Sequence, residues 1–190
     1  MTLSLKRCSR RLVVKALLIA MVCAPFAGIV ADDDPLLAES RAITAEFAAE
    51  MQAALQASMA SGGPAAAIGA CRDLAPQIAA TLSAKSGAIV SRTSLRVRNL
   101  QNRPENWQTE ILEEFEQGTA STEHFERLSD GSARYMKAIP TGALCLNCHG
   151  TILAPDVRAS IDVAYPDDQA RGYYLGDVRG AFSVVWPVAD

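Results

Sequence analysis

The sequence predicts an α+β fold in which two helices are followed by an antiparallel sheet with short insertions. Apolar residues recur at steps of three and four over residues 35–85, as on one face of a helix. Residues 88–98 alternate with period two, and residues 180–188 are rich in β-branched and aromatic residues, so both ranges are predicted strands. Residues 125–139 form a predicted hairpin around the turn sequence of residues 129–132. Helices followed by strands are typical of the α+β class.

The first predicted helix covers residues 35–60 and ends at Ser61-Gly62-Gly63. Its apolar stripe consists of Ile43, Phe47, Met51, Leu55 and Met59. The second covers residues 64–85 and carries Cys71 on its apolar face. Pro76 lies inside it and cannot donate a backbone hydrogen bond, which predicts a kink just after Cys71.

The remaining elements are shorter. In the strand at residues 88–98 we expect one face to carry apolar and hydroxyl side chains and the solvent face to carry three arginines. The first face consists of Ile89, Ser91, Thr93, Leu95 and Val97, and the second of Arg92, Arg96 and Arg98. Residues 104–117 and 155–163 are predicted helices, and a loop carries Cys145 to Gly150. Trp107, Tyr173 and Trp186 are predicted core residues.

Residues 1–31 have the pattern of a secretory signal peptide. Five basic residues precede an uncharged run from Ala16 to Ala31, and three aspartates follow. The run of 16 residues is shorter than the roughly 20 that span a bilayer, although an uncleaved anchor is the competing interpretation. We therefore expect an exported or periplasmic protein whose single domain is residues 32–190, without a stable membrane span after cleavage.

The predicted mature chain is acidic. Residues 1–31 hold five of the 18 basic residues and no acidic residue, so residues 32–190 carry 13 basic and 21 acidic residues. Nucleic-acid binding needs clustered Lys and Arg, so this balance argues against it. It favours a partner protein with a basic surface.

Three cysteines remain after signal cleavage, namely Cys71, Cys145 and Cys148. An odd number does not suit a simple disulfide framework. Cys145-Leu146-Asn147-Cys148-His149 is C-x-x-C-H, the attachment sequence of a c-type haem. Two thiols at this spacing each add to one vinyl group of the porphyrin, and the adjacent His149 then reaches the iron. The motif predicts one covalently attached haem c.

Three other interpretations of the motif are weaker. A structural zinc site needs a fourth ligand, which Cys71 or His124 would have to supply. A thioredoxin-like redox pair belongs at a helix start after an early strand, whereas this pair lies late in the chain. A surface disulfide gives no role to His149.

The ligand on the other side of the iron is left open by the residues alone. No methionine follows His149, so the order found in common small cytochromes is excluded. Met51 and Met59 suit core packing, and His124 lies in a polar segment and is expected to be solvated. Cys71 is either the ligand or an inert buried thiol.

Several segments resemble a bacterial family of exported monohaem c-type proteins, long catalogued as a domain of unknown function, which includes a cyanobacterial cytochrome. The matching segments are residues 92–99, Asn102, 104–107, 135–139, 165–168, 172–173 and 176–182, within about residues 36–188. The resemblance implies a PAS-like antiparallel sheet with two long N-terminal helices and His/Cys axial ligation. The family's cysteine matches Cys71, in the segment from Gly69 to Pro76. Ala138 departs from the proline that the family often has.

These observations favour a redox- or gas-responsive haem sensor that binds a diatomic gas and signals through a partner protein. Thiolate ligation by Cys71 would hold the reduction potential low. The alternative is a low-potential electron carrier that docks a basic redox partner. A haem enzyme needs a distal acid or base, for which only His124 is present, so we expect no enzyme activity. At most one of Arg92, Arg96 and Arg98 is expected to meet the haem propionates.

Overall fold

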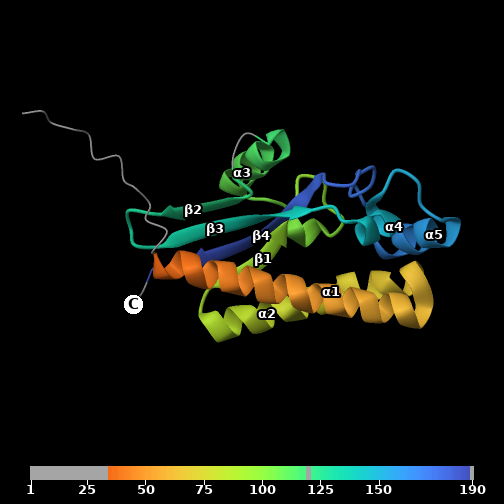
Figure 1. The fold of residues 1–190 in the computed structure, drawn as a ribbon, viewed down its shortest axis with the longest axis horizontal. Helices are drawn as coiled ribbons and strands as arrows, with labels where there is room; N and C mark the ends of the chain where they lie inside the picture. The colour runs from red at the N-terminus through yellow and green to blue at the C-terminus, as the bar shows by residue number, and fades with distance from the viewer. Residues whose placement is uncertain (1–33, 119–120, 189–190) are drawn as a thin grey trace, which may run out of the picture. The chain divides into compact units, whose positions relative to one another are not determined.

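The computed structural model describes residues 34–118 and 121–188, which all lie in one compact unit. The helices and strands follow in this order: α1 (Pro35–Gly69), α2 (Ala75–Ser86), β1 (Ile89–Thr93), α3 (Asn106–Gln117), β2 (Glu123–Arg127), β3 (Ala133–Pro140), α4 (Leu146–His149), α5 (Pro155–Ala164) and β4 (Val178–Trp186). The strands form one antiparallel sheet in the order β1-β4-β3-β2. Helices α1 and α2 lie along one face of the sheet, α3 on the other, and α4 and α5 beyond one end (Figure 1). The predicted α+β class is confirmed, and the predicted signal peptide, residues 1–31, lies outside the described residues.

The first two predicted helices meet at Gly62 and Gly63 as expected, but helix α1 continues beyond these glycines to Gly69. Gly62 and Gly63 have non-helical backbone angles and interrupt α1 where its end is predicted. The kink expected after Cys71 takes the form of a π-helical turn, Ala70–Leu74, that runs directly into α2. A π turn is a way to accommodate the hydrogen bond that Pro76 cannot donate, and such turns are frequent at functional sites.

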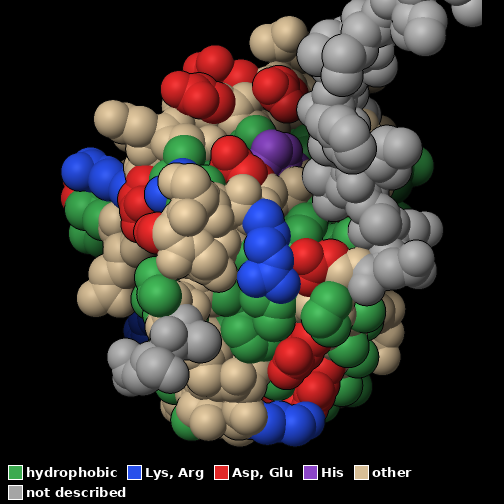
Figure 2. Space-filling model, turned by 90° about the vertical axis from the view of Figure 1, so that its left-hand side faces the viewer, with side chains coloured by type: hydrophobic (Ala, Val, Ile, Leu, Met, Phe, Trp, Pro, Cys, Tyr) green, Lys and Arg blue, Asp and Glu red, His purple; other side chains and the backbone are tan. Residues whose placement is uncertain are grey.

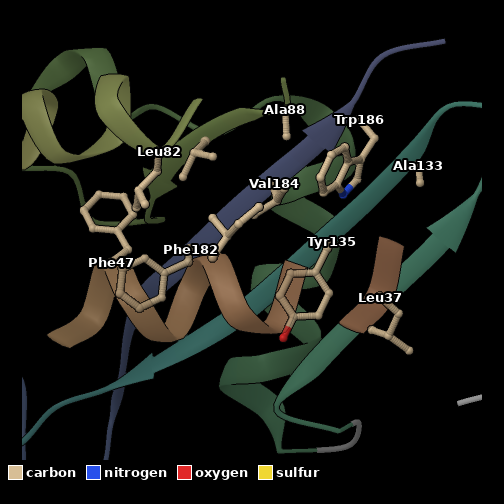
Figure 3. Packing of buried hydrophobic residues seen from close by; sticks show 11 residues of the cluster. Leu37, Phe47, Leu82, Ala88, Ala133, Tyr135, Phe182, Val184 and Trp186 are labelled. Carbon is tan, nitrogen blue, oxygen red and sulfur yellow. The ribbon is translucent and has the colours of Figure 1, made fainter. Parts of the chain in front are cut away.

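The main core lies between the two long helices and the sheet (Figure 3). Phe47 of α1 and Phe182 of β4 face each other with ring centroids 5.0 Å apart. Trp186 is buried and its indole N–H donates to the Ser40 hydroxyl over 2.8 Å. Burying a large apolar side chain contributes about 1.5–3 kcal/mol, so these contacts hold α1 against the sheet. Trp107, a predicted core residue, is only partly buried, beside the smaller cluster under α3.

The prediction for the strand at residues 88–98 is wrong in its length and in its faces. Strand β1 ends at Thr93, and Ile89 on the predicted inner face is 62% exposed, whereas Val90 is buried. Val90 and Arg92 pair with Val184 and Phe182, which belong to the core under α1. We call the sheet face with these residues, which α1 and α2 cover, the helix face. Arg92 therefore points toward the helices rather than toward solvent.

Ion pairs fix the start of α1 to the β2–β3 hairpin. Arg127 donates to Asp34 over 2.9 Å, and Arg41 donates to Glu123 over 2.6 Å. On the end of the molecule shown in Figure 2, acidic and basic side chains are interspersed with hydrophobic ones. Across the described ranges, no helix combines the length and apolar character that crossing a membrane requires.

Candidate functional site

A cavity of about 930 Å³ lies beside the core, between α1, the π turn, the sheet and the C-x-x-C-H segment. This volume is near the upper end of the range of about 300–1,000 Å³ that is usual for cofactor and small-molecule sites. One wall is the apolar stripe of α1, where Ala48, Met51, Leu55 and Met59 recur at steps of three and four. Met51 and Met59 thus line the cavity, which the prediction of simple core packing did not foresee. Met51 also packs against the core.

The C-x-x-C-H segment forms a 3₁₀ turn followed by the one-turn helix α4. Cys145 and Cys148 are three residues apart on this turn, both are free thiols, and both line the cavity. Burial raises the pKa of the Cys148 thiol, with the Arg98 charge opposing. Gly150 ends the helix, and a Cβ there would lie 2.6 Å from the carbonyl oxygen of Leu146. Only glycine lets the chain pass this close.

His149 is held in one orientation by the loop that follows α5. Its Nδ1 lies 2.7 Å from the Ala170 carbonyl oxygen, and because a carbonyl can only accept, Nδ1 carries the proton and donates it. Burial, together with the charges of Arg179 and Arg98, holds the pKa of His149 well below its usual range. The ring is therefore neutral, and the lone pair of Nε2 is left to bind a metal. Histidine ligands are commonly oriented in this way by a backbone carbonyl.

Arg98 ties the C-x-x-C-H segment to that same loop. Its guanidinium donates to the Cys148 carbonyl over 2.6 Å, to the Ala170 carbonyl over 3.2 Å and to the carboxylate of Asp168 over 2.9 Å. The Asp168 side chain is 1% exposed. Burial acts to raise the pKa of Asp168, but hydrogen bonds from Arg98 and Arg171 outweigh it and leave that pKa lowered. Arg98 therefore has a structural role, although it also lines the cavity.

Cys71 lies in the π turn, is half-buried, and lines the same cavity as Cys145, Cys148 and His149. The structure thus brings the four predicted site residues together around one space. In the part of the chain that the structure describes, no group of three or more His, Cys, Asp and Glu side chains is arranged to hold a bare metal ion.

The other candidate ligands divide between the two faces of the sheet. His124 pairs in register with Met136, which is fully buried in the cluster under α3, and neither residue lines the cavity. His124 is half-buried rather than solvated. Cys71, Met51 and Met59 are the candidates that reach the cavity.

The lining of the cavity includes one acidic side chain, Glu123. Glu123 accepts hydrogen bonds from Arg41 and from the Tyr135 hydroxyl, and Lys137 lies 3.7 Å away. The hydrogen bond from Arg41, outweighing partial burial and assisted by Tyr135 and Lys137, lowers the pKa of Glu123 to about 2. This carboxylate is therefore ionised and balanced by its own cations.

A model of the Tll0287-like family matches residues 32–187 of the chain. The chain belongs to the Tll0287-like family. Among solved structures, the crystal structure of the cyanobacterial heme-protein Tll0287 matches with a TM-score of 0.68 at 24% sequence identity, over 83% of this chain and 98% of that chain. At this identity the match shows a shared fold. A search of curated proteins found no match. The family resemblance seen in the sequence is thus confirmed.

Sequence reasoning missed one residue that lines the cavity, Arg179. Its side chain lines the cavity, and its Nε is buried without a hydrogen-bond partner. The available signal was Gly180, since an isolated glycine inside a strand pattern indicates a bulge or a close backbone approach. A Cβ at Gly180 would lie 2.4 Å from the Thr93 carbonyl oxygen.

Proposed function

We propose that this chain is an exported c-type haem protein whose PAS-like sheet and N-terminal helices enclose one covalent haem, and that it acts as a redox- or gas-responsive sensor. His149 and Cys71 are the proposed axial ligands. One observation carries the proposal: Cys145, Cys148, His149 and Cys71 line a single, largely apolar cavity of cofactor size. The match to a family that includes a haem protein supports it.

The residues present fit a haem. Cys145 and Cys148 are free thiols that line the same cavity, so each S–H can add across one vinyl group, forming an S–C bond while the hydrogen goes to the other vinyl carbon. His149 already uses Nδ1 toward Ala170, which leaves Nε2 for the iron. The unpartnered Nε of Arg179 is a buried donor that an anionic group of the cofactor would satisfy.

Bound haem would supply reversible one-electron chemistry and a position for a small gas ligand. Cys71 would close that position as thiolate, and thiolate donation favours the oxidised form and lowers the reduction potential. The π turn that carries Cys71 departs from regular helix geometry, so a small local rearrangement can withdraw the sulfur. Withdrawal of Cys71 is the event that the sensor function requires.

The test is an absorption spectrum of the exported protein, ferric and ferrous, with and without carbon monoxide. The protein is produced in a host that attaches haem c. A Cys145→Ser/Cys148→Ser variant should lose covalent attachment, measured as a mass lacking the haem. Cys71→Ala should convert a low-spin ferric spectrum to a high-spin one, whereas the matched controls Met51→Leu and Met59→Leu should not. An unchanged spectrum in Cys71→Ala rules the thiolate out.

Electron transfer is the second candidate, and exposed apolar side chains beside the motif favour it. Gly150 and Tyr173, which form an isolated parallel bridge, are each followed by a short segment. These segments carry Ile152, Tyr174 and Leu175, exposed at 87%, 67% and 68%. An apolar patch near a cofactor edge suits transient docking of a redox partner. A reversible couple that keeps both axial ligands would favour this carrier function, and loss of Cys71 on reduction would favour sensing.

Three further parts of the proposal concern the setting. We infer that the protein works in the periplasm or another exported location, because residues 1–31 have the pattern of a signal peptide. We also infer that it is not an enzyme, since His124, the acid or base offered by the sequence, lies outside the cavity. Its partners would be a signalling or redox protein and a diatomic gas.

A further inference from the structure

Five basic side chains line the cavity, and they differ in whether an acidic group balances them. Arg41 and Lys137 are balanced by Glu123, and Arg98 by Asp168. Within the described ranges, no acidic side chain forms an ion pair with the other two, Arg92 and Arg179. These two guanidinium groups are the unbalanced charges of the cavity wall.

Arg179 reaches the cavity only because strand β4 is irregular. Neighbouring Ala181 packs in the cluster under α3, so regular alternation would place Arg179 on that same face. Ile139 pairs with Gly180 and Pro140 with Val178, however, which leaves Arg179 as the extra residue of a β-bulge. Bulges turn a side chain to a new direction and are common beside functional sites. Here the bulge adds Arg179 to the cavity lining on the helix face.

The bulge is held in place by contacts that leave the Arg179 side chain free for another partner. The Ser94 hydroxyl donates to the Arg179 carbonyl oxygen over 2.7 Å, and the Tyr173 hydroxyl donates to the same oxygen over 3.3 Å. A Cβ at Gly180 would collide with the Thr93 carbonyl, so the bulge depends on glycine there. The backbone is thus fixed while the side-chain Nε remains without a partner.

Arg92 comes to the same place from the neighbouring strand. It pairs in register with Phe182, and its guanidinium lies 5.7 Å from the centre of the Phe47 ring. Burial, followed by the nearby charge of Arg179, lowers the pKa of Arg92 to about 10. Two like charges held together in a partly apolar wall are unfavourable unless an anion joins them.

We propose that Arg92 and Arg179 form a carboxylate-binding site and hold the two propionate groups of the haem. The inference rests on the proposed function and assigns the cofactor's orientation within it. It agrees with the expectation that at most one of Arg92, Arg96 and Arg98 serves this purpose, and it adds Arg179. Arg98 is committed to Asp168, and Arg96 stacks on Tyr173 with its guanidinium 3.6 Å from the ring centre.

The test uses haem-loaded protein and follows the reduction potential against pH, together with the propionate bending bands in the resonance Raman spectrum. Variants are Arg92→Gln and Arg179→Gln, with Arg92→Lys and Arg179→Lys as charge-conserving partners. Exposed Arg103 provides a matched control, Arg103→Gln. An arginine beside a carboxylate lowers its pKa by about 1 to 3. Each glutamine variant should therefore strengthen proton binding by the propionates about tenfold or more, and shift the Raman bands. The potential at pH 8 should fall with the lost positive charge.

The lysine variants should retain most of the wild-type pH profile, and Arg103→Gln should match wild type. A second measurement varies phosphate and chloride in the wild-type protein, whose potential should not respond if the propionates already occupy the site. Coloured protein in which both glutamine variants keep the wild-type profile and bands overturns this inference alone. A potential that follows anion concentration instead assigns the site to a free anion and also overturns it. A colourless protein without bound haem overturns the proposed function and this inference with it.

Discussion

Replacing Arg98 with methionine should destabilise the whole unit, independently of any cofactor. The change keeps much of the side-chain length but removes every hydrogen bond that the guanidinium donates. Asp168 then keeps only Arg171 and the Ala170 N–H as donors, in a setting where its side chain is 1% exposed. The charge of this carboxylate is left buried and incompletely balanced.

The expected cost follows from these contacts. Breaking a buried ion pair from one side costs about 3–5 kcal/mol. Arg171 remains beside Asp168 and moderates the loss, and the Ala170 carbonyl keeps the hydrogen bond from His149. The Cys148 carbonyl loses its donor, at about 1 kcal/mol. We expect a decrease of about 3–4 kcal/mol in the free energy of unfolding. For a chain of this size that corresponds to a lower Tm by about 6–16 °C.

The assay is urea unfolding of Arg98→Met, Asp168→Asn and the double variant at pH 7, with Arg103→Gln as control. Coupling should make the double variant less destabilised than the two single variants added together, by about 1 kcal/mol or more. Because the pKa of Asp168 is lowered in the folded state, the pair stabilises above its unfolded pKa of 3.8 and loses effect as the pH falls further. The cost of Arg98→Met should therefore shrink on acidification. A cost below about 1 kcal/mol, or additive single variants, would refute this account of Arg98.

Three other predictions concern close contacts and one carboxylate. Gly150→Ala should reduce stability by about 1–3 kcal/mol, measured by thermal unfolding, because its Cβ would lie 2.6 Å from the Leu146 carbonyl oxygen. Gly180→Ala should cost at least as much, since the added Cβ meets the Thr93 carbonyl at 2.4 Å and φ is 155°; a neutral result would contradict the bulge. Glu123→Gln should cost on the order of 2–3 kcal/mol at pH 7, because the folded pKa of about 2 lies below 4.5. That stabilisation is present above pH 4.5 and lost toward pH 2. Between these pH values the free energy of unfolding should therefore fall less with acidification in the variant than in the wild type.

Elements with strong local signals could be predicted from the sequence. The hairpin around Asp130-Gly131 and helix α3 before Gly118 occur as expected, because a turn sequence or a terminal glycine acts within a few residues. Helix α5 and the final strand β4 likewise follow from local patterns in the sequence. The four residues predicted for the site also gather around one cavity.

Features that depend on distant partners could not be predicted. Residues 88–98 have the alternation of one strand, but pairing with β4 ends at Thr93, and Ser94 instead bonds to the backbone of residue 179. The faces were assigned wrongly because helix packing covers the side of Arg92, a fact set by α1 rather than by the strand. Arg179 was missed for a similar reason, since a bulge changes the side-chain direction that alternation predicts.

The C-x-x-C-H motif and its surroundings carry different parts of the chemistry. The motif itself places two thiols and one imidazole within five residues, across a 3₁₀ turn and the helix α4 that follows it, which is why it can be recognised in sequence. The groups that orient His149 and keep it neutral come from elsewhere. The Ala170 carbonyl, 21 residues away, orients the ring. Burial and the charges of Arg179 and Arg98 lower the pKa of His149, and Arg98, 50 residues before Cys148, also binds the Ala170 and Cys148 carbonyls. A change at Arg98 can therefore alter the electronic state of the imidazole without touching the motif. If the motif holds haem as proposed, contacts outside the five residues, here those of Arg98 and Asp168, also affect the reduction potential through His149.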